Sequence, residues 1–180
     1  MQLAGLTHNT AYRQLPLLTA YCPLFMIHVQ PISSPTDLDQ AFAIRRDVFV
    51  VEQNVPEAEE YDEFETISHH FLATFQDKKG LSSACGTARW RRTSKGIKLE
   101  RFAVRKKFRG KGVGKALVKA VLDDVFSLQP EPIESIYLHA QVSAMPLYTS
   151  FGFKAVGPLF DECNIQHCKM VLPGSAYSHA

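Results

Sequence analysis

The sequence is short of the features that mark membrane-bound, secreted and disulfide-stabilised proteins. No apolar run in its 180 residues approaches the roughly 20 residues that a transmembrane helix needs. Residues 1–25 lack the basic start and the clear cleavage site of a secretory leader. The four cysteines, at 22, 85, 163 and 168, show no paired spacing. We therefore expect a cytoplasmic protein with reduced cysteines and no membrane association.

Metal-binding spacings are also scarce. Cys163 and Cys168 are separated by four residues, and His167 lies beside the second of them. Zinc usually takes four ligands in standard spacings, which this group does not supply. We expect no metal cofactor.

A strong excess of one charge is absent, because 20 basic residues face 18 acidic ones for a net charge of +2. The two signs are nevertheless segregated. The basic window from Arg89 to Lys119 holds 13 Lys and Arg against Glu100 alone, which gives 13 − 1 = +12. An acidic segment precedes it, with Glu52, Glu57, Glu59, Glu60, Asp62, Glu63 and Glu65 in a stretch without Lys or Arg.

Each charged region has two interpretations at this stage. The basic window serves a phosphorylated ligand or a nucleic acid, or it is partly a solvated face. The overall balance disfavours a dedicated nucleic-acid binder, so we expect no nucleic-acid partner. The acidic segment attracts a cationic amine, or it is a solvated loop.

The glycine-rich stretch from Arg105 to Lys115 is the most informative motif. It lies between an apolar run (99–104) and a helical pattern (112–128) with apolar residues at helical spacing. Glycines allow a tight turn, and a helix start offers unpaired N–H groups to an anion. A P-loop is excluded because its leading glycine and its hydroxyl are missing, and a dinucleotide fingerprint is excluded by the glycine spacing.

Alternation, helical periodicity and turn residues predict the remaining elements. Strands are expected at 25–32, 70–76, 83–92, 97–104, 134–140, 153–157 and 167–172. Helices are expected at 36–51, with Thr36 as the N-cap, at 112–128 and at 144–151. The helix between the fourth and fifth strands predicts that those two strands are parallel.

Three motifs resemble the GNAT superfamily of N-acetyltransferases. The stretch Arg109-Gly-Lys-Gly-Val-Gly114 resembles its R/Q-x-x-G-x-G/A signature. Residues 44–56 resemble an I-R-x-x-V-F-V-x-E-Q-x-V-P opening found in one branch of predicted acyltransferases, and residues 147–153 resemble the late Y-x-x-x-G-F element. Together these cover about residues 26–172.

The resemblance implies an α/β (α+β) fold of the GNAT type. Such a fold has a mixed, mostly antiparallel central sheet, a splayed parallel strand pair and helices on both faces. We expect an extension at residues 1–25, a GNAT domain at 26–173 and a tail at 174–180. A homodimer is left open as the oligomeric state.

The implied activity is transfer of an acetyl group from acetyl-CoA, as co-substrate, to a primary amine of a small molecule or protein. The amine would attack directly in a ternary complex. The alternative is a CoA-binding regulatory module without turnover. The resemblance assigns cofactor binding to the backbone of one strand and to the glycine loop, that is, to Phe102, Ala103, Val104, Arg109, Gly110, Lys111, Gly112, Val113, Gly114 and Lys115.

Three residues are candidates for the proton transfers. The resemblance places Tyr148 where the family's general acid lies, and a phenol can protonate a departing thiolate. Glu100 and His167 are the candidate bases, and alternation along its strand predicts that Glu100 shares a face with Phe102 and Val104. Glu100 could equally be a carboxylate paired with nearby cations, and His167 a surface histidine. His139 is expected to be a packing residue or a cavity wall.

Overall fold

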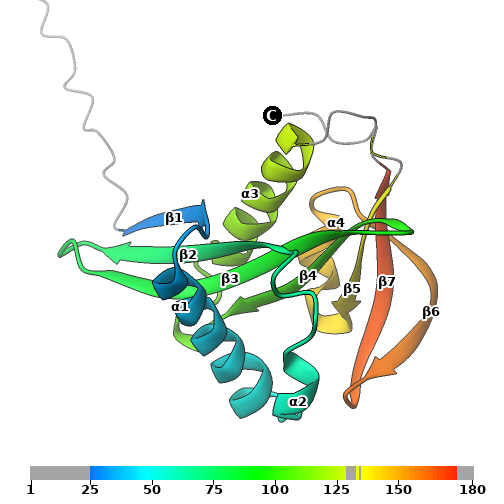
Figure 1. Ribbon diagram of the computed structural model, residues 1–180, viewed down its shortest axis with the longest axis horizontal. Helices are drawn as coiled ribbons and strands as arrows, with labels where there is room; N and C mark the ends of the chain where they lie inside the picture. Colours follow the sequence, from blue (N-terminus) through cyan, green and yellow to red (C-terminus); the bar gives the residue numbers. More distant parts are fainter. Residues whose placement is uncertain (1–24, 129–132, 134, 174–180) are drawn as a thin grey trace, which may run out of the picture.

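The computed structural model describes residues 25–128, 133 and 135–173, which form one seven-stranded sheet in the order β1-β2-β3-β4-β5-β7-β6 (Figure 1). Every neighbouring pair is antiparallel except β4 and β5, which are parallel. The expected mixed sheet is therefore confirmed. The strands are β1 (Phe25–Pro31), β2 (His69–Asp77), β3 (Ser82–Thr93), β4 (Gly96–Val104), β5 (Ser135–Gln141), β6 (Lys154–Glu162) and β7 (Ile165–Pro173).

Helices connect and cover these strands. They are α1 (Pro35–Arg45), the π-helix η1 (Arg46–Glu52), α2 (Glu57–Glu60), the 3₁₀ turn η2 (Lys106–Phe108), α3 (Val113–Leu128), the 3₁₀ turn η3 (Val142–Ala144) and α4 (Met145–Thr149). None of the helices in the described part of the chain is long and apolar enough to cross a membrane. The expected extension, apart from Phe25, and the expected tail lie outside the described residues.

The parallel pair opens soon after it begins. The Cα partners are Ile97 with Ile136 and Lys98 with Tyr137, and no later residue of β4 is paired with β5. β4 nevertheless continues to Val104. The predicted splayed strand pair is therefore present, and it divides the sheet near its middle.

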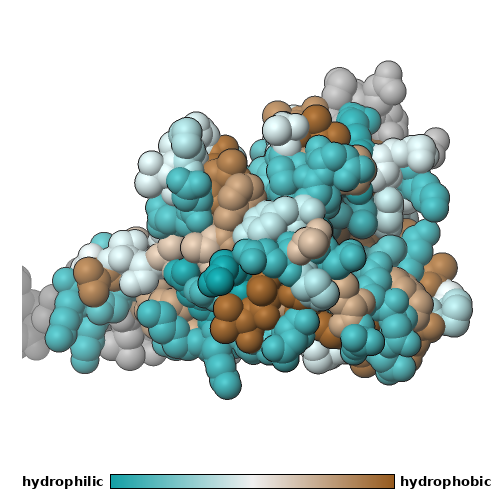
Figure 2. Space-filling model, turned by 60° about the horizontal axis from the view of Figure 1, so that its bottom comes forward, coloured by the Kyte–Doolittle hydropathy of each residue, from teal (hydrophilic) through white to brown (hydrophobic). Residues whose placement is uncertain are grey.

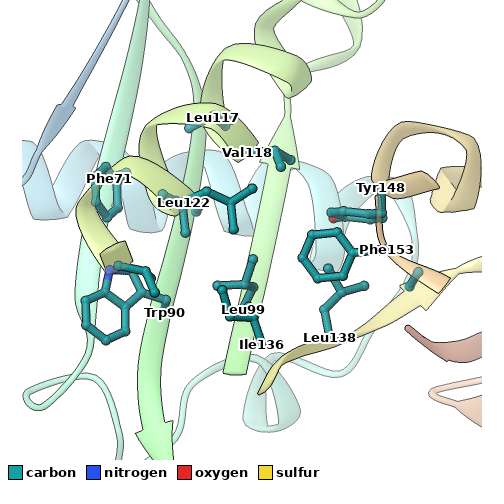
Figure 3. Close-up of a cluster of buried hydrophobic side chains, with 14 of the residues drawn as sticks. Phe71, Trp90, Leu99, Leu117, Val118, Leu122, Ile136, Leu138, Tyr148 and Phe153 are labelled. Carbon is teal, nitrogen blue, oxygen red and sulfur yellow. The ribbon is translucent and has the colours of Figure 1, made fainter. Parts of the chain in front are cut away.

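Helices lie on both faces of the sheet, as expected. α3 carries apolar residues at helical spacing and buries them on one face, where Leu117 and Leu122 pack near Leu99 and Ile136 (Figure 3). On the other face, Ile44 and Val48 form a smaller buried cluster with Leu72 and Ala103. The two apolar layers fix the middle of the sheet between α1 and α3.

The first helix differs from the sequence-based expectation at both ends. Its N-cap is Ser34 rather than Thr36, because Pro35 suits the first helical position and the Ser34 hydroxyl accepts a hydrogen bond from the Asp37 N–H at 3.1 Å. Beyond Arg45 the chain continues as the π-helix η1. Such wide turns are rare and often lie at functional sites.

β6 is longer than the expected strand at 153–157. The strand continues through Pro158 because β6 is an edge strand, where a missing N–H is tolerated. The pairing with β7 shifts between Ala155 and Leu159, and the strand then resumes to Glu162. A tight turn at Cys163 and Asn164, both with positive φ (49° and 61°), leads into β7.

Candidate active site

A cavity of about 190 Å³ lies where β4 and β5 separate. Its wall is built by η1, α2, β4, β5, α4 and the β6–β7 hairpin. The structure brings four of the sequence-predicted site residues together there: Glu100, Phe102, Tyr148 and His167.

A bulge in β4 decides which of its residues share a face. Thr87 is opposite Ala103, but Arg89 is opposite Glu100, so β4 has one residue more than β3 between these pairs. Arg101 lies in the bulge with a φ of +58°, a conformation that is uncommon for arginine.

The bulge corrects the predicted placement of Glu100. Phe102 and Val104 pack against the core under α3, whereas Ala103 belongs to the cluster under α1. Glu100 contacts Arg89 and therefore lies on the α1 face. Simple alternation failed because one extra residue reverses the facing of every position after it.

The glycine loop has the geometry of an anion site. Gly110 and Gly112 have φ values of +73° and +91°, where residues with a side chain are strained. The Ala116 N–H donates to the Gly112 carbonyl at 3.0 Å and begins the helical pattern of α3. Within the described chain, the N–H groups of residues 110–115 have no hydrogen-bond acceptor. Unpaired donors at a helix start attract an anion.

The charged side chains around this loop differ in their partners. Arg109 forms a two-pronged ion pair with Glu52, with Nη2 to Oε2 at 2.8 Å, and its Nε donates to the Val104 carbonyl at 2.9 Å. The Lys111 ammonium lies 4.9 Å from the ring centre of Phe75. Arg109 is therefore held by the Glu52 carboxylate.

Residues of the opening motif connect the cavity to the loop. Glu52, near the end of η1, binds Arg109 of the glycine motif. Phe49 and Gln53 line the cavity, and the Gln53 side-chain oxygen accepts from Nε2 of Gln141 on β5 at 2.9 Å. The Glu52–Arg109 and Gln53–Gln141 contacts join residues far apart in the chain, so the sequence did not predict them.

The acidic segment and the basic window are partners in space. Arg89 of the window binds Asp62 and Glu65, and Arg109 binds Glu52. Arg45, which precedes both regions, binds Glu60 and Glu65. The side chains of Arg45 and Arg89 are 1% and 0% exposed. The molecular face shown in Figure 2 is mostly hydrophilic, with hydrophobic surface in small separate patches. Glu60, Asp62 and Glu65 are therefore held by buried arginines, whereas Glu57, Glu59 and Glu63 of the same segment are exposed.

The pKa values of these acids are shifted in different directions, although burial acts to raise all of them. Burial raises the pKa of Glu60, and its pairing with Arg45 only partly offsets this. Burial also acts to raise the pKa of Asp62 and Glu65, but hydrogen bonds from Arg89 and Arg45 outweigh it and lower both pKa values.

Glu100 is enclosed by cations. Its Oε1 lies 2.9 Å from Arg89 Nη2 and 2.8 Å from Arg91 Nε, and its Oε2 lies 3.0 Å from Lys98 Nζ. Burial acts to raise its pKa, but the charges of Arg89 and Lys98 outweigh burial and lower it. These contacts favour the ion-pair interpretation of Glu100, because a carboxylate stabilised in this way is a weak proton acceptor.

Tyr148 lies on the short helix α4 and is 6% exposed. Its ring centre lies 5.8 Å from that of Phe102 in an edge-on contact. It also lies 6.1 Å from that of Phe153, which Figure 3 shows beside it. The described residues offer its hydroxyl no hydrogen-bond partner, and burial raises the pKa of the phenol. Tyr148 therefore holds its proton beside the cavity.

Two histidines carry their proton on Nδ1, which leaves Nε2 of each ring as the acceptor. His167 Nδ1 lies 2.7 Å from the Ile165 carbonyl, which can only accept a hydrogen bond, so Nδ1 carries the proton. His139 Nδ1 lies 2.8 Å from Glu162 Oε1. Both histidines line the cavity. Sequence reasoning did not identify Glu162, because its approach to His139 depends on the β6–β7 hairpin.

Comparisons of sequence agree with the motifs. A profile for the family described as "Acetyltransferase (GNAT) domain" matches residues 35–173. YjcF of Bacillus subtilis, named an uncharacterized N-acetyltransferase, is 37% identical over 139 residues, which cover 74% of this chain and 91% of that protein. YyaT of the same organism, named an uncharacterized protein, is 33% identical over 147 residues, covering 80% and 94%.

Comparisons of structure give the same architecture. The crystal structure of Escherichia coli ElaA matches with a TM-score of 0.65 and 26% identity, covering 81% of this chain and 99% of that one. An acyl-CoA N-acyltransferase from Pseudomonas aeruginosa matches with a TM-score of 0.63 and 23% identity, covering 82% and 98%. The second likeness shows the shared fold.

Proposed function

Because the chain belongs to the GNAT acetyltransferase family, we propose that it moves an acetyl group from acetyl-CoA to a primary amine. The family supports acyl transfer in general. The acetyl donor, an amine of a small molecule or protein as acceptor, and direct attack in a ternary complex are the specific parts of the proposal.

The single observation that carries the proposal is the set of unpaired N–H groups at residues 110–115. They would hold the diphosphate of acetyl-CoA, with Lys111 and Lys115 adding charge at the loop. The loop leads into α3 directly beside the opened end of β4. A cofactor bound there would therefore direct its thioester arm into the gap between β4 and β5.

The opened strand would hold that arm. Beyond Lys98, no described residue pairs with β4 on its β5 side, so an extended pantetheine chain with two amides can add to the edge like a strand. An N–H group of Phe102 or Val104 would then polarise the thioester carbonyl and stabilise the negative charge that develops on its oxygen. The buried Ala103 fixes this stretch against α1.

Tyr148 is the proposed general acid. Its hydroxyl has no partner in the described chain and lies beside the cavity, and burial keeps it protonated. A CoA thiolate leaving near it would take the phenolic proton. His167, with a free Nε2, remains a candidate base, and Glu100 is less suited because three cations hold its charge.

The proposal is tested by binding and by turnover. Calorimetry should show saturable binding of acetyl-CoA and CoA, and a thiol-release assay over a panel of amines should identify an acceptor. Binding without thiol release from any amine would favour the regulatory CoA-binding module. Binding of neither compound would overturn the proposal as a whole.

Tyr148→Phe tests the acid on an amine that turns over. We expect kcat to fall by roughly 10²–10⁴-fold with the Kd for acetyl-CoA unchanged, because only the proton donor is removed. Tyr137→Phe is the matched control, since that buried tyrosine bonds Thr93 at 3.0 Å outside the cavity. Equal rates for the two variants would contradict the role of Tyr148.

A further inference from the structure

His139 and Glu162 form a carboxylate–imidazole pair at the cavity wall. Nδ1 of His139 lies 2.8 Å from Oε1 of Glu162, and both residues line the cavity. A carboxylate accepts only, so it fixes the proton on Nδ1 and leaves Nε2 as a lone-pair acceptor. We propose, on the basis of the proposed function, that His139 takes the ammonium proton of the acceptor amine and that Glu162 positions and stabilises it in doing so.

The hairpin between β6 and β7 brings the pair together. Glu162 ends β6, and the turn at Cys163 and Asn164 returns the chain into β7, which pairs with β5. His139 lies on β5, next but one to Gln141, and Gln141 is opposite His167. The two imidazoles therefore lie on one face of neighbouring strands.

Phe160 holds both rings in place. Its ring centre lies 4.9 Å from that of His139 in an edge-on contact, and 6.1 Å from that of His167 in a more parallel one. Phe160 thus restricts both imidazole rings. The two histidines differ in the group that accepts the hydrogen bond from Nδ1. His139 bonds a charged carboxylate, whereas His167 bonds the neutral Ile165 carbonyl.

That difference favours His139 as the proton acceptor. Protonation creates a positive charge, which an adjacent carboxylate stabilises far more than a carbonyl does. His167 is 8% exposed, so its ring has little contact with water through which a proton could leave. The side chains of His139 and Glu162 are 30% and 47% exposed, which lets the imidazolium pass its proton to solvent after each turnover.

Two lysines belong to the surroundings of the His139–Glu162 pair. Lys169 on β7 is opposite His139, and its ammonium lies 5.3 Å from the ring centre of Tyr137. Lys98 on β4 lies near Glu162 and binds Glu100 at 3.0 Å. Glu59, Glu60 and Glu100 are the other carboxylates of the cavity, and Glu100 binds Lys98. The hydrogen bond from His139 lowers the pKa of Glu162 and keeps it ionised.

The proton balance of the reaction is complete with these groups. The ammonium gives one proton to His139 Nε2, and the free amine then forms a C–N bond with the thioester carbonyl carbon. The C–S bond breaks as Tyr148 gives its proton to sulfur. The attacking nitrogen loses its second proton, which restores the Tyr148 phenol, and His139 releases its own proton to water.

The test measures kcat and the pH profile of kcat/KM on an amine that the wild type acetylates. It compares the wild type with His139→Gln, Glu162→Gln, Glu162→Asp and His167→Gln. We expect His139→Gln to lower kcat by roughly 10²-fold or more and to remove the acid limb of the profile. Glu162→Gln should lower kcat by about tenfold and move the acid limb to lower pH, with Glu162→Asp in between, since loss of a carboxylate destabilises the imidazolium. His167→Gln should keep the acid limb.

His69→Gln is the matched control, because His69 stacks on Trp90 at 4.1 Å outside the cavity and should leave the rate and the limb unchanged. An acid limb that disappears in His167→Gln and persists in His139→Gln would overturn the inference while leaving acetyl transfer intact. Failure of the wild type to release thiol with any amine would instead remove the proposed function.

A readout that needs no turnover completes the test. Nitrogen-15 NMR of the histidine rings should show His139 protonated on Nδ1 in the wild type, with the downfield proton of a carboxylate hydrogen bond, and should lose that proton signal in Glu162→Gln. A wild-type spectrum with the His139 proton on Nε2 would contradict the proposed arrangement directly.

Discussion

The charged residues on the two sides of the cavity differ in how deeply they are buried and in how they are paired. Behind the wall toward α1, the guanidinium groups of Arg45 and Arg89 are buried and each is bound by two or more carboxylates, of which Glu60 and Glu100 line the cavity. On the wall toward β6, Glu162 binds His139 and remains about half exposed. The first arrangement fixes charges in place, whereas the second leaves a group that can gain and lose a proton.

The comparison shows what burial requires of a charge. A guanidinium removed from water is tolerated only when carboxylates replace its hydration, and Arg89 has three of them in Asp62, Glu65 and Glu100. An exposed carboxylate needs no such compensation, so Glu162 is free to serve a proton transfer. Three predictions test this difference, beginning with the largest effect.

Loss of Arg89 should destabilise the protein most. Arg89→Met leaves three carboxylates partly buried without their shared cation, and we expect the free energy of unfolding to fall by about 3–5 kcal/mol. Urea unfolding with an unchanged m-value is the measurement. Arg46→Met is the control, because its pair with Glu57 spans 3.5 Å between exposed side chains and should change stability by at most about 0.5 kcal/mol. Similar losses in the two variants would show that the buried network is not special.

Acid should weaken the buried wall. Asp62, Glu65 and Glu100 have pKa values in the folded protein below their ordinary values of 3.8, 4.5 and 4.5. Their stabilisation is therefore present above about pH 4.5 and is lost as the pH falls through the lowered values, because the unfolded chain then binds more protons. Glu60, whose pKa is raised, acts in the opposite direction and reduces the slope.

The measurement is the urea midpoint as a function of pH, which should fall steadily below pH 4.5. Asp62→Asn should make that fall shallower, whereas Glu162→Gln should change it little because Glu162 is about half exposed. A midpoint that stays constant through this range would contradict the account of the network.

The smallest effect is expected at the glycine loop. Glu52 holds Arg109 across the site proposed for the cofactor diphosphate, so Glu52→Gln removes a negative charge from it. We expect CoA to bind up to about fivefold more tightly, since exposed ion pairs contribute at most roughly 1 kcal/mol. Calorimetry at two salt concentrations measures this, with Asp47→Asn, which acts on Arg105, as the control. Weaker binding in Glu52→Gln would show that the pair serves instead to shape the loop.

Local patterns predicted the elements well where the chain alone decides them. The helix expected at 112–128 is α3, and the glycines before it form a tight turn with positive φ values at Gly110 and Gly112. The parallel arrangement of β4 and β5 followed from the helix between them. These features depend on residues that are close in the chain, so they can be predicted from the sequence.

Features that depend on register were missed or misplaced. The bulge at Arg101 places Glu100 on the sheet face opposite Phe102. No residue type in β4 indicates that a bulge forms there. The pairing of Glu162 with His139 needed the extended β6, and that of Glu52 with Arg109 needed η1 to lie beside the loop. Both pairings join residues that are far apart in the chain, so they cannot be predicted from the residue types at either position.

The sequence by itself determined the order of strands and helices, the turn that offers its amides to an anion, and the family to which the chain belongs. Only the tertiary structure decided which charges neutralise each other and which stay available for chemistry. The physical reason is that helical and strand periodicity are set within a few residues, whereas the energy of a charge depends on which partners and how much water surround it after folding.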